Sequence, residues 1–446
     1  MALALSPGPA CEECRGRPRL KEKAAGGFLA RAGSARRFFR DLGPGLITGA
    51  ADDDPSGIAT YSSAGASFGF GMLWAALLTL PLMSAVQLMC ARIGIVSRRG
   101  LASVLRRHYS VRLLWFACAL LLVANVVNVA ADLGGMAEAV ELLTGLPSLW
   151  LIMPITALVL SLLVFGSYRL VVRIFKWLTL VLFAYVGAGL LAHPDWREVL
   201  RATLLPRIAF DRSSLMTLVA VFGTTISPYL FFWQAAHNVE EEKALERDVG
   251  RPRETVLAKL RRARTDVLVG MSISNVIAYF IILTTAATLH AAGQRDIQTA
   301  EQAAQALRPI AGDLAEELFC IGLVGAGFLG VPILAGSAAY AIAEAAAWRR
   351  GIDKRPRLAR KFYAVIALAM VGGMAIDYAG VNAIRMLFWA AVVNGVLAPP
   401  LIAIILHVSN NRAVMGEHTN GRLLNVLGFA TTLVMTAAAI AMLFAR

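Results

Sequence analysis

Asp52-Asp53-Asp54-Pro55-Ser56-Gly57 interrupts the first long apolar stretch of this sequence, and Gly223-Thr224-Thr225-Ile226-Ser227-Pro228 interrupts a later one. Proline lacks the N–H that a helix interior needs, and glycine tolerates almost any backbone angle, so both stretches predict a broken helix. In hydrocarbon, a carboxylate or a free backbone carbonyl is costly unless protein encloses it. The two breaks therefore predict an enclosed site that binds a cation.

The composition is that of a polytopic helical membrane protein. The chain is 58% hydrophobic and 16% charged, and it holds many apolar windows of ~20 residues, the length that crosses ~30 Å of hydrocarbon. The first forty residues are polar and basic, so we expect the first span to serve as its own insertion signal. In a lipid bilayer, the net charge of +14 reports the placement of loops and indicates no nucleic-acid partner.

Positive charge is concentrated in alternate loops. The basic loops are residues 15–40, 98–112, 169–176, 243–264, 349–361 and 412–422. The loops between them carry acidic residues, such as Glu138, Asp195 and Glu301. By the positive-inside rule, the basic loops and the amino terminus are cytoplasmic, in a multi-pass protein of the cell inner (plasma) membrane.

Cutting the sequence at these loops gives eleven predicted spans. They are 43–68, 71–95, 113–134, 149–167, 175–192, 214–236, 265–289, 315–348, 362–378, 383–408 and 423–445. The first five (43–192) and the next five (214–408) start from opposite sides of the membrane, which predicts two inverted five-helix repeats. A cytoplasmic basic tail (1–42) precedes them, and an extra helix (423–446) follows. Inverted repeats whose first helices are both broken are typical of secondary transporters, with the site between the halves.

The residues at the two breaks offer oxygen ligands. Asp54 supplies a carboxylate, and the other candidate ligands are Asp53, Gly57, Thr224 and Ser227. Mg²⁺ prefers oxygen ligands and sheds its water reluctantly, so these groups suit a weak transport site. No Met or Cys lies between Ala220 and Trp233, so the second break offers nothing to a thiophilic metal.

Each break also has a simpler interpretation. Asp54-Pro55 would be a solvated turn between two short helices, and Thr224 to Pro228 would be a kink whose hydroxyls cap their own helix. Elsewhere, Cys11 and Cys14 form a CxxC without the second pair that a tetrahedral site needs. We find no HExxH cluster and no nucleophile with a base, and so we expect neither an enzyme nor a cofactor.

Several motifs resemble those of the NRAMP divalent-metal transporters. Gly43-Pro44-Gly45, Asp54-Pro55-Ser56-Gly57 and Ala64-Gly65-Ala66-Ser67-Phe68-Gly69 resemble that family's GPG, DPGN and AGxQFG. Ala131-Asp132-Leu133 resembles its third-span TDL. The similarity covers about residues 43–406, and it implies an all-α fold with a LeuT-like 5+5 inverted repeat.

The departures from the family pattern are informative. Gly57 stands where the family has the Asn of DPGN, and Ser227 stands where it has a Met, so an amide and a thioether ligand are absent. Tyr229 replaces a His, and Gly135 replaces one member of an acidic pair, of which Asp132 remains. We interpret Asp132 as a buried, hydrogen-bonded strut, with a proton carrier as the alternative. The substitution pattern is similar to the NRAMP-related magnesium transporters.

Asn394 lies near the place where the family has a Gln that completes metal coordination. It is therefore a candidate ligand. The alternative is an amide that ties two helices together, an interaction worth ~0.6 kcal/mol on average in membrane bundles.

These observations predict a monomeric facilitator for hydrated divalent cations, chiefly Mg²⁺ and then Mn²⁺, that works by alternating access. We expect no proton coupling, because no His lies in mid-span and half of the acidic pair is absent. The nearest alternative is a proton-coupled Mn²⁺/Fe²⁺ symporter. An amino-acid transporter of the same fold is a further one, although the three aspartates would repel a substrate carboxylate.

Overall fold

Helices are the main secondary structure of the chain that the structure describes, and no strand occurs in that part. The computed structural model describes residues 48–49, 51–165, 179–206, 209–246, 255–352 and 356–445. The tail 1–42 with Cys11 and Cys14, the Gly43-Pro44-Gly45 motif and part of the predicted fifth span lie outside these residues.

The described helices differ widely in length. The longer ones are α3 (Pro55–Phe68), α4 (Leu73–Ser97), α6 (Val111–Thr144), α7 (Ser148–Phe165), α11 (Arg212–Thr225), α12 (Pro228–Glu246), α13 (Val256–Thr285), α16 (Ala315–Ala345), α17 (Arg360–Asp377), α18 (Ala383–Asn410) and α20 (Arg422–Phe444). The shorter ones are η1 (Gly69–Met72), α5 (Leu101–His108), η2 (Thr179–Phe183), α9 (Ala184–Leu191), α10 (Trp196–Leu204), η3 (Ala286–His290), α14 (Ala300–Ala304), η4 (Gln305–Leu307), α15 (Arg308–Ala311), η5 (Gly312–Leu314), η6 (Pro356–Leu358) and α19 (Arg412–Met415).

Eight helical segments of the described chain are long and apolar enough to cross a membrane. One of them, Pro55–Ser97, contains the second predicted span and the part of the first that follows Asp54. Helix α17 lies at the predicted ninth span but is not among the eight, and α9 covers the described end of the fifth. The chain is thus a multi-pass membrane protein.

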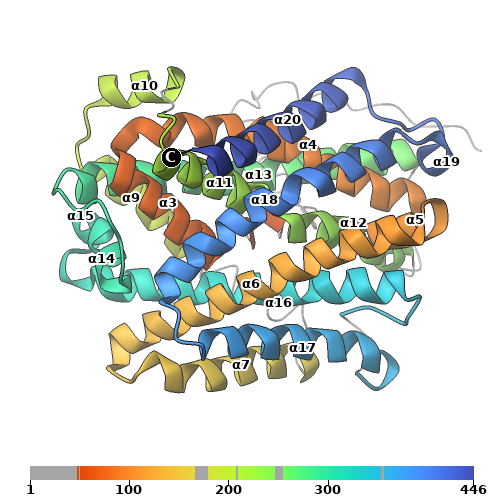
Figure 1. The fold of residues 1–446 in the computed structure, drawn as a ribbon, viewed down its shortest axis with the longest axis horizontal. Coiled ribbons are helices and arrows are strands. Elements are labelled where there is room, and N and C mark those ends of the chain that lie inside the picture. Colours follow the sequence, from red (N-terminus) through yellow and green to blue (C-terminus); the bar gives the residue numbers. More distant parts are fainter. Residues whose placement is uncertain are drawn as a thin grey trace, which may run out of the picture. The chain divides into compact units, whose positions relative to one another are not determined.

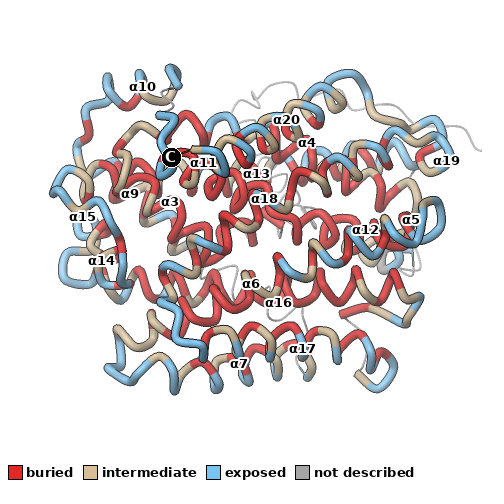
Figure 2. The backbone as a smooth tube through the Cα atoms, viewed as in Figure 1, coloured by how far each residue is buried: buried red, intermediate tan, exposed pale blue. Residues whose placement is uncertain are grey.

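The helical segments differ in how deeply they are buried, and the segment that carries the second break is buried most. In Arg212–Lys243, 94% of the most apolar window is buried, against 22% in Ser148–Phe165 and 28% in Arg422–Phe444. Helices α7 and α17 lie side by side (Figure 1) and carry many exposed residues, whereas α12 and α16 are buried along most of their length (Figure 2). Exposed apolar side chains on the outer helices, such as Trp150 at 77%, suit contact with lipid.

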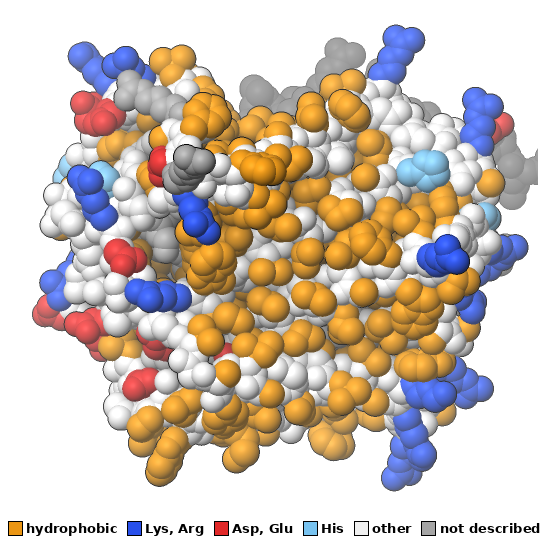
Figure 3. Space-filling model, viewed as in Figure 1, with side chains coloured by type: hydrophobic (Ala, Val, Ile, Leu, Met, Phe, Trp, Pro, Cys, Tyr) orange, Lys and Arg blue, Asp and Glu red, His pale blue; other side chains and the backbone are white. Residues whose placement is uncertain are grey.

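Charged side chains gather at the two ends of the helices. In Figure 3, a broad apolar surface separates two charged edges, and most of the acidic side chains in view lie at the edge where Figure 1 places α14 and α15. The opposite edge, near α5 and α19, is mainly basic. An apolar belt between polar edges is the surface that a bilayer requires.

Candidate metal site

The first break is built by Asp54 as the N-cap of α3. Its backbone is extended (φ −71°, ψ 170°), and Pro55 follows at the start of the helix, where an N–H is not needed. Asp54 Oδ1 accepts hydrogen bonds from Gly57 N (2.8 Å) and Ser56 Oγ (2.7 Å). Asp54 is only 2% exposed, and so the interpretation of Asp54-Pro55 as a solvated turn is wrong.

The second break separates α11 from α12. Ile226 leaves the helical conformation (φ −111°, ψ 61°), and Pro228 begins α12 without an N–H to donate. Ser227 Oγ, in the break itself, lies near two carbonyls of the last turn of α11, at 3.0 Å from Gly223 O and 2.5 Å from Thr224 O. The hydroxyl proton of Ser227 is therefore used in a hydrogen bond to α11, as expected if the hydroxyls of this kink cap their own helix. A bound ion would contact only the lone pairs of the Ser227 oxygen.

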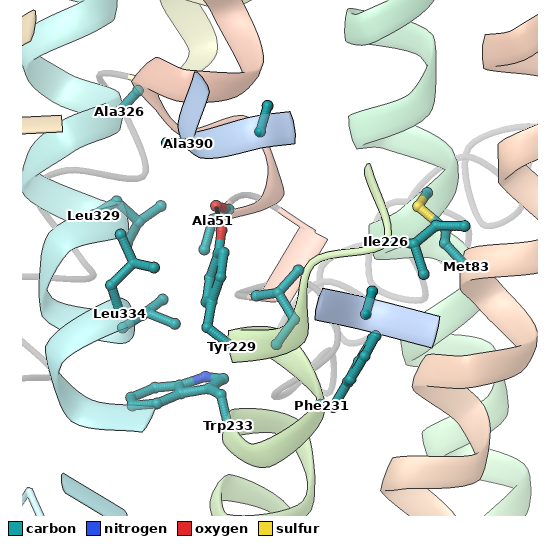
Figure 4. Close-up of a cluster of buried hydrophobic side chains, with 14 of the residues drawn as sticks. Ala51, Met83, Ile226, Tyr229, Phe231, Trp233, Ala326, Leu329, Leu334 and Ala390 are labelled. Atoms are coloured by element: carbon teal, nitrogen blue, oxygen red, sulfur yellow. Dashed lines mark hydrogen bonds between the residues drawn. The ribbon is translucent and has the colours of Figure 1, made fainter. Parts of the chain in front are cut away.

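The two breaks lie against each other. Tyr229 OH, on the second residue of α12, lies 2.7 Å from Ala51 O and 3.1 Å from Asp54 Oδ2, and Figure 4 shows the ring pointing toward Ala51. A Cβ on Gly57 would lie 3.3 Å from Thr224 Oγ1. That hydroxyl is buried without a hydrogen-bond partner in the described part of the chain. The structure thus brings together Asp54, Gly57 and Thr224.

Asp52 and Asp53 share one hydrogen-bond donor, Ser274 of α13. Ser274 Oγ lies 2.9 Å from Asp52 Oδ2 and 3.1 Å from Asp53 Oδ1. A hydroxyl has one proton, so it serves one carboxylate at a time. The other oxygen of Asp52, Oδ1, is buried without a partner among the described residues. Contact between Asp53 and the ion or its waters stays a prediction.

Asp132 of α6 lies beside Asp54. A Cβ on Gly330 of α16 would lie 3.0 Å from Asp54 Cβ and 3.5 Å from Asp132 Oδ2. Neither carboxyl oxygen of Asp132 makes a hydrogen bond of regular geometry among the described residues, and whether Asp132 acts as a strut or as a proton carrier stays a prediction. The sequence predicted the residue but not its place, because nothing local indicates that α6 passes Asp54.

The four aspartates, Asp52, Asp53, Asp54 and Asp132, are at most 2% exposed. In the described part of the chain, no Lys, Arg or His forms an ion pair with any of them. Buried carboxylates without a basic partner require protons or a bound cation. Among the described residues, no three His, Cys, Asp or Glu side chains are arranged to hold a metal. An ion at the breaks would therefore keep water or carbonyl ligands.

Asn394 of α18 pairs with Asn128 of α6. The two amides exchange hydrogen bonds of 2.8 Å and 3.1 Å, and both residues are fully buried. The sequence left two interpretations of Asn394, and this contact fits the one in which its amide links two helices. The role of Asn394 as a metal ligand stays a prediction.

Asn394→Ala is expected to destabilise the protein and to leave Mg²⁺ flux per folded molecule within about two-fold. The expected loss is ~0.6 to 1.7 kcal/mol, the range found for hydrogen bonds between membrane helices. Thermal unfolding of the Asn394→Ala, Asn128→Ala and double variants gives the coupling free energy. A collapse of flux without a change in unfolding temperature would favour the ligand interpretation instead.

The chain is similar to proteins of one family along most of its length. It matches the family model described as "Nramp: Natural resistance-associated macrophage protein-like" over residues 45–445. It is 29% identical over 427 residues to the divalent metal cation transporter MntH of Ralstonia nicotianae, with 90% of each chain covered. It is 28% identical over 298 residues to the protein of the same name from Deinococcus radiodurans, with 66% of each chain covered.

Solved structures share the fold. A crystal structure of the Eremococcus coleocola manganese transporter has a TM-score of 0.72 at 19% identity, covering 91% of this chain and 86% of that one. Mhp1, a nucleobase-cation-symport-1 family transporter, has a TM-score of 0.53 at 16% identity, covering 90% of each chain. At these identities the likeness shows the fold alone. It confirms the predicted all-α, LeuT-like architecture.

Proposed function

This chain belongs to the Nramp family, and on that premise we propose that it carries hydrated divalent cations, Mg²⁺ first and Mn²⁺ second, without proton coupling. Members of the family are transporters, so the chain is a membrane transporter of divalent metals and not an enzyme. The metal ion is its substrate, and no cofactor is needed. We place it in the cell inner membrane as a monomer with a cytoplasmic amino terminus, an orientation that the basic loops support.

The preference for Mg²⁺ rests on the oxygen-only chemistry of the two breaks. Asp54 contributes a carboxylate, and Thr224 contributes a buried hydroxyl without a hydrogen-bond partner among the described residues. Gly57 stands between them without a side chain. Ser227 offers an oxygen where the family pattern has a thioether. Hard oxygen donors favour Mg²⁺ over softer transition metals, and a site with one carboxylate leaves room for retained waters.

The proposal of uncoupled transport rests on what surrounds Gly135. A Cβ at this position would lie 2.9 Å from Leu387 Cδ1, so an apolar side chain faces the place of the family's second acidic residue. Coupling is also not needed energetically, because a divalent ion entering a cell gains ~4.6 kcal/mol per 100 mV of membrane potential. We therefore infer that the ion gradient and the membrane potential drive transport.

One observation favours the second candidate, a proton-coupled Mn²⁺ symporter. Asp132 makes no hydrogen bond of regular geometry in the described part of the chain, and it lies beside Asp54 across Gly330. A buried carboxyl group close to a metal site is a group that can carry a proton. The two candidates therefore differ in whether Asp132 releases a proton with each ion.

Uptake by proteoliposomes tests this difference. Under the proposal, Mg²⁺ influx leaves the internal pH unchanged, and Asp132→Asn alters flux less than about five-fold, since no proton step depends on the residue. Internal pH is followed with a trapped dye while Mg²⁺, Mn²⁺ or Fe²⁺ is added outside. Acidification that accompanies the metal, and that disappears in Asp132→Asn, would establish the symporter and overturn uncoupled transport.

A further inference from the structure

We infer that a second, weaker site for a hydrated divalent cation lies in a pocket between α6, α7, α14 and the turn from α17 to α18, apart from Asp54. The pocket measures about 520 Å³. Four carboxylates line it, those of Glu138, Glu141, Glu301 and Asp377. Only the choice of ion rests on the proposed function, because the acidic pocket is defined without it.

Asp377 is the residue that points to a ligand. It is 8% exposed, and its Oδ2 is buried without a hydrogen-bond partner among the described residues. Its carboxyl group faces Gly134, which also lines the pocket, because a Cβ on Gly134 would lie 3.0 Å from Asp377 Oδ1. A buried carboxylate is costly, and a cation held in the pocket would offset its negative charge.

Two further carboxylates are held in place by backbone donors. Glu138 Oε1 accepts a hydrogen bond from Ala300 N (3.2 Å), at the start of α14. Glu141 Oε2 accepts one from Ser148 N (2.8 Å), at the start of α7. These bonds orient both side chains at the pocket wall, as the supporting groups of a binding site do.

An ion in the pocket would be held through its water molecules. Among the described residues, no three acidic or His side chains are close enough to ligate one bare metal. Mg²⁺ usually keeps several of its waters, and carboxylates can bind it through them.

The charged side chains that line the pocket are all acidic, which favours the accumulation of cations in it. None of the described residues that line it is Lys or Arg, so no lining cation opposes the four carboxylates. A cleft lined by one sign of charge raises the local concentration of counter-ions and their association rates by ~10- to 1000-fold at low salt. Gly134 is two residues from Asp132 on α6, and so the pocket lies close along the chain to the transport site. We expect it to load ions for transport.

Binding of Mn²⁺ to the full-length chain in detergent tests the inference, because electron paramagnetic resonance measures the free ion directly. The wild-type chain should bind two Mn²⁺ ions, and Asp54→Asn should keep the weaker one. The Asp377→Asn/Glu138→Gln double variant should lose the weaker ion and keep the other. Added KCl should weaken the pocket binding severalfold, because salt screens exposed charges most strongly.

Mg²⁺ uptake gives a second readout. In the double variant, KM should rise about five-fold at low salt with maximal flux unchanged, and the difference should shrink in high salt. Glu317→Gln is the matched control, since Glu317 is an exposed acidic residue in the first turn of α16 that does not line the pocket. If the double variant fails to fold, Glu301→Gln replaces an exposed pocket carboxylate and should give a smaller rise in KM.

The outcomes separate this inference from the proposed transport site. An Asp54→Asn chain that binds no Mn²⁺, or a double variant that still binds two ions, would overturn the pocket site. An Asp54→Asn chain that binds two ions, while the double variant binds one, would support the pocket site and refute Asp54 as a ligand. A rise in KM that high salt leaves unchanged would mean that Asp377 and Glu138 act through the structure alone.

Discussion

Asp54→Asn is expected to reduce Mg²⁺ flux by about 100-fold or more and to leave thermal stability nearly unchanged. The loss follows from charge, because two unit charges 4 Å apart interact by ~4 kcal/mol at an effective dielectric constant of ~20, and ~1.4 kcal/mol is a factor of ten. Stability is retained because Asn is as good an N-cap as Asp, so the hydrogen bonds from Gly57 N and Ser56 Oγ can persist. Mg²⁺ uptake into proteoliposomes that contain a magnesium-sensitive dye measures the flux.

The control for this variant is the same substitution at another N-cap. Asp211 caps α11 and accepts a hydrogen bond from Ser214 N (3.0 Å), which holds the pKa of its carboxyl group below the usual value. Asp211 is exposed, and so Asp211→Asn should leave flux unchanged. Asp54→Ala removes the helix cap as well as the charge, so it should lose flux and also ~1 kcal/mol of stability. Comparison with Asp54→Asn, which keeps the cap, separates the two effects. Mg²⁺ flux within about two-fold of wild type in Asp54→Asn would mean that the ion binds elsewhere.

Local chemistry in the sequence was enough to locate the two breaks. Pro55 and Pro228 lack an N–H, and each begins a helix in the structure, directly after a residue that the sequence predicts to be unwound. The alternation of basic and acidic loops indicated the approximate places of the helices but not their ends, since α12 runs to Glu246 and α13 begins at Val256, each about ten residues from the predicted bound. Helix α6 runs to Thr144, ten residues beyond the predicted end at 134, and its last turns carry Glu138 and Glu141, which line the acidic pocket.

The partners of the site residues were not predictable in the same way. Ser274 is 222 residues from Asp52, and Asn128 is 266 residues from Asn394. A single sequence carries no signal for a pair that only the packing of distant helices brings together. The position of Asp132 beside Asp54 has the same origin, since Gly330 of a third helix separates them. The sequence therefore predicted the type of ligand atoms at each break, but not which residues of distant helices lie beside them.

The Gly57→Asn/Ser227→Met double variant is expected to shift the preference from Mg²⁺ toward Mn²⁺ by at least about ten-fold in relative flux, and to make Cd²⁺ a substrate. The change restores an amide and a thioether, and soft ligands select softer metals. Some adjustment is needed, because a Cβ at Gly57 would lie 3.2 Å from Asp52 O and 3.3 Å from Thr224 Oγ1. Competition between Mg²⁺ and Mn²⁺ for uptake, with Cd²⁺ as the soft probe, measures the shift.

Gly57→Ala/Ser227→Leu is the matched control, since it adds apolar bulk at both positions and brings no new ligand atom. Both double variants remove the Ser227 hydroxyl, which contacts the carbonyls of Gly223 and Thr224, so any cost of losing that contact is common to them. If ligand chemistry sets the ion preference, only the Asn/Met variant gains Mn²⁺ and Cd²⁺ flux, and the Ala/Leu variant simply loses Mg²⁺ flux. If the two variants change the Mn²⁺ to Mg²⁺ ratio alike, the size of the site selects the ion, and the oxygen-donor argument for Mg²⁺ is wrong.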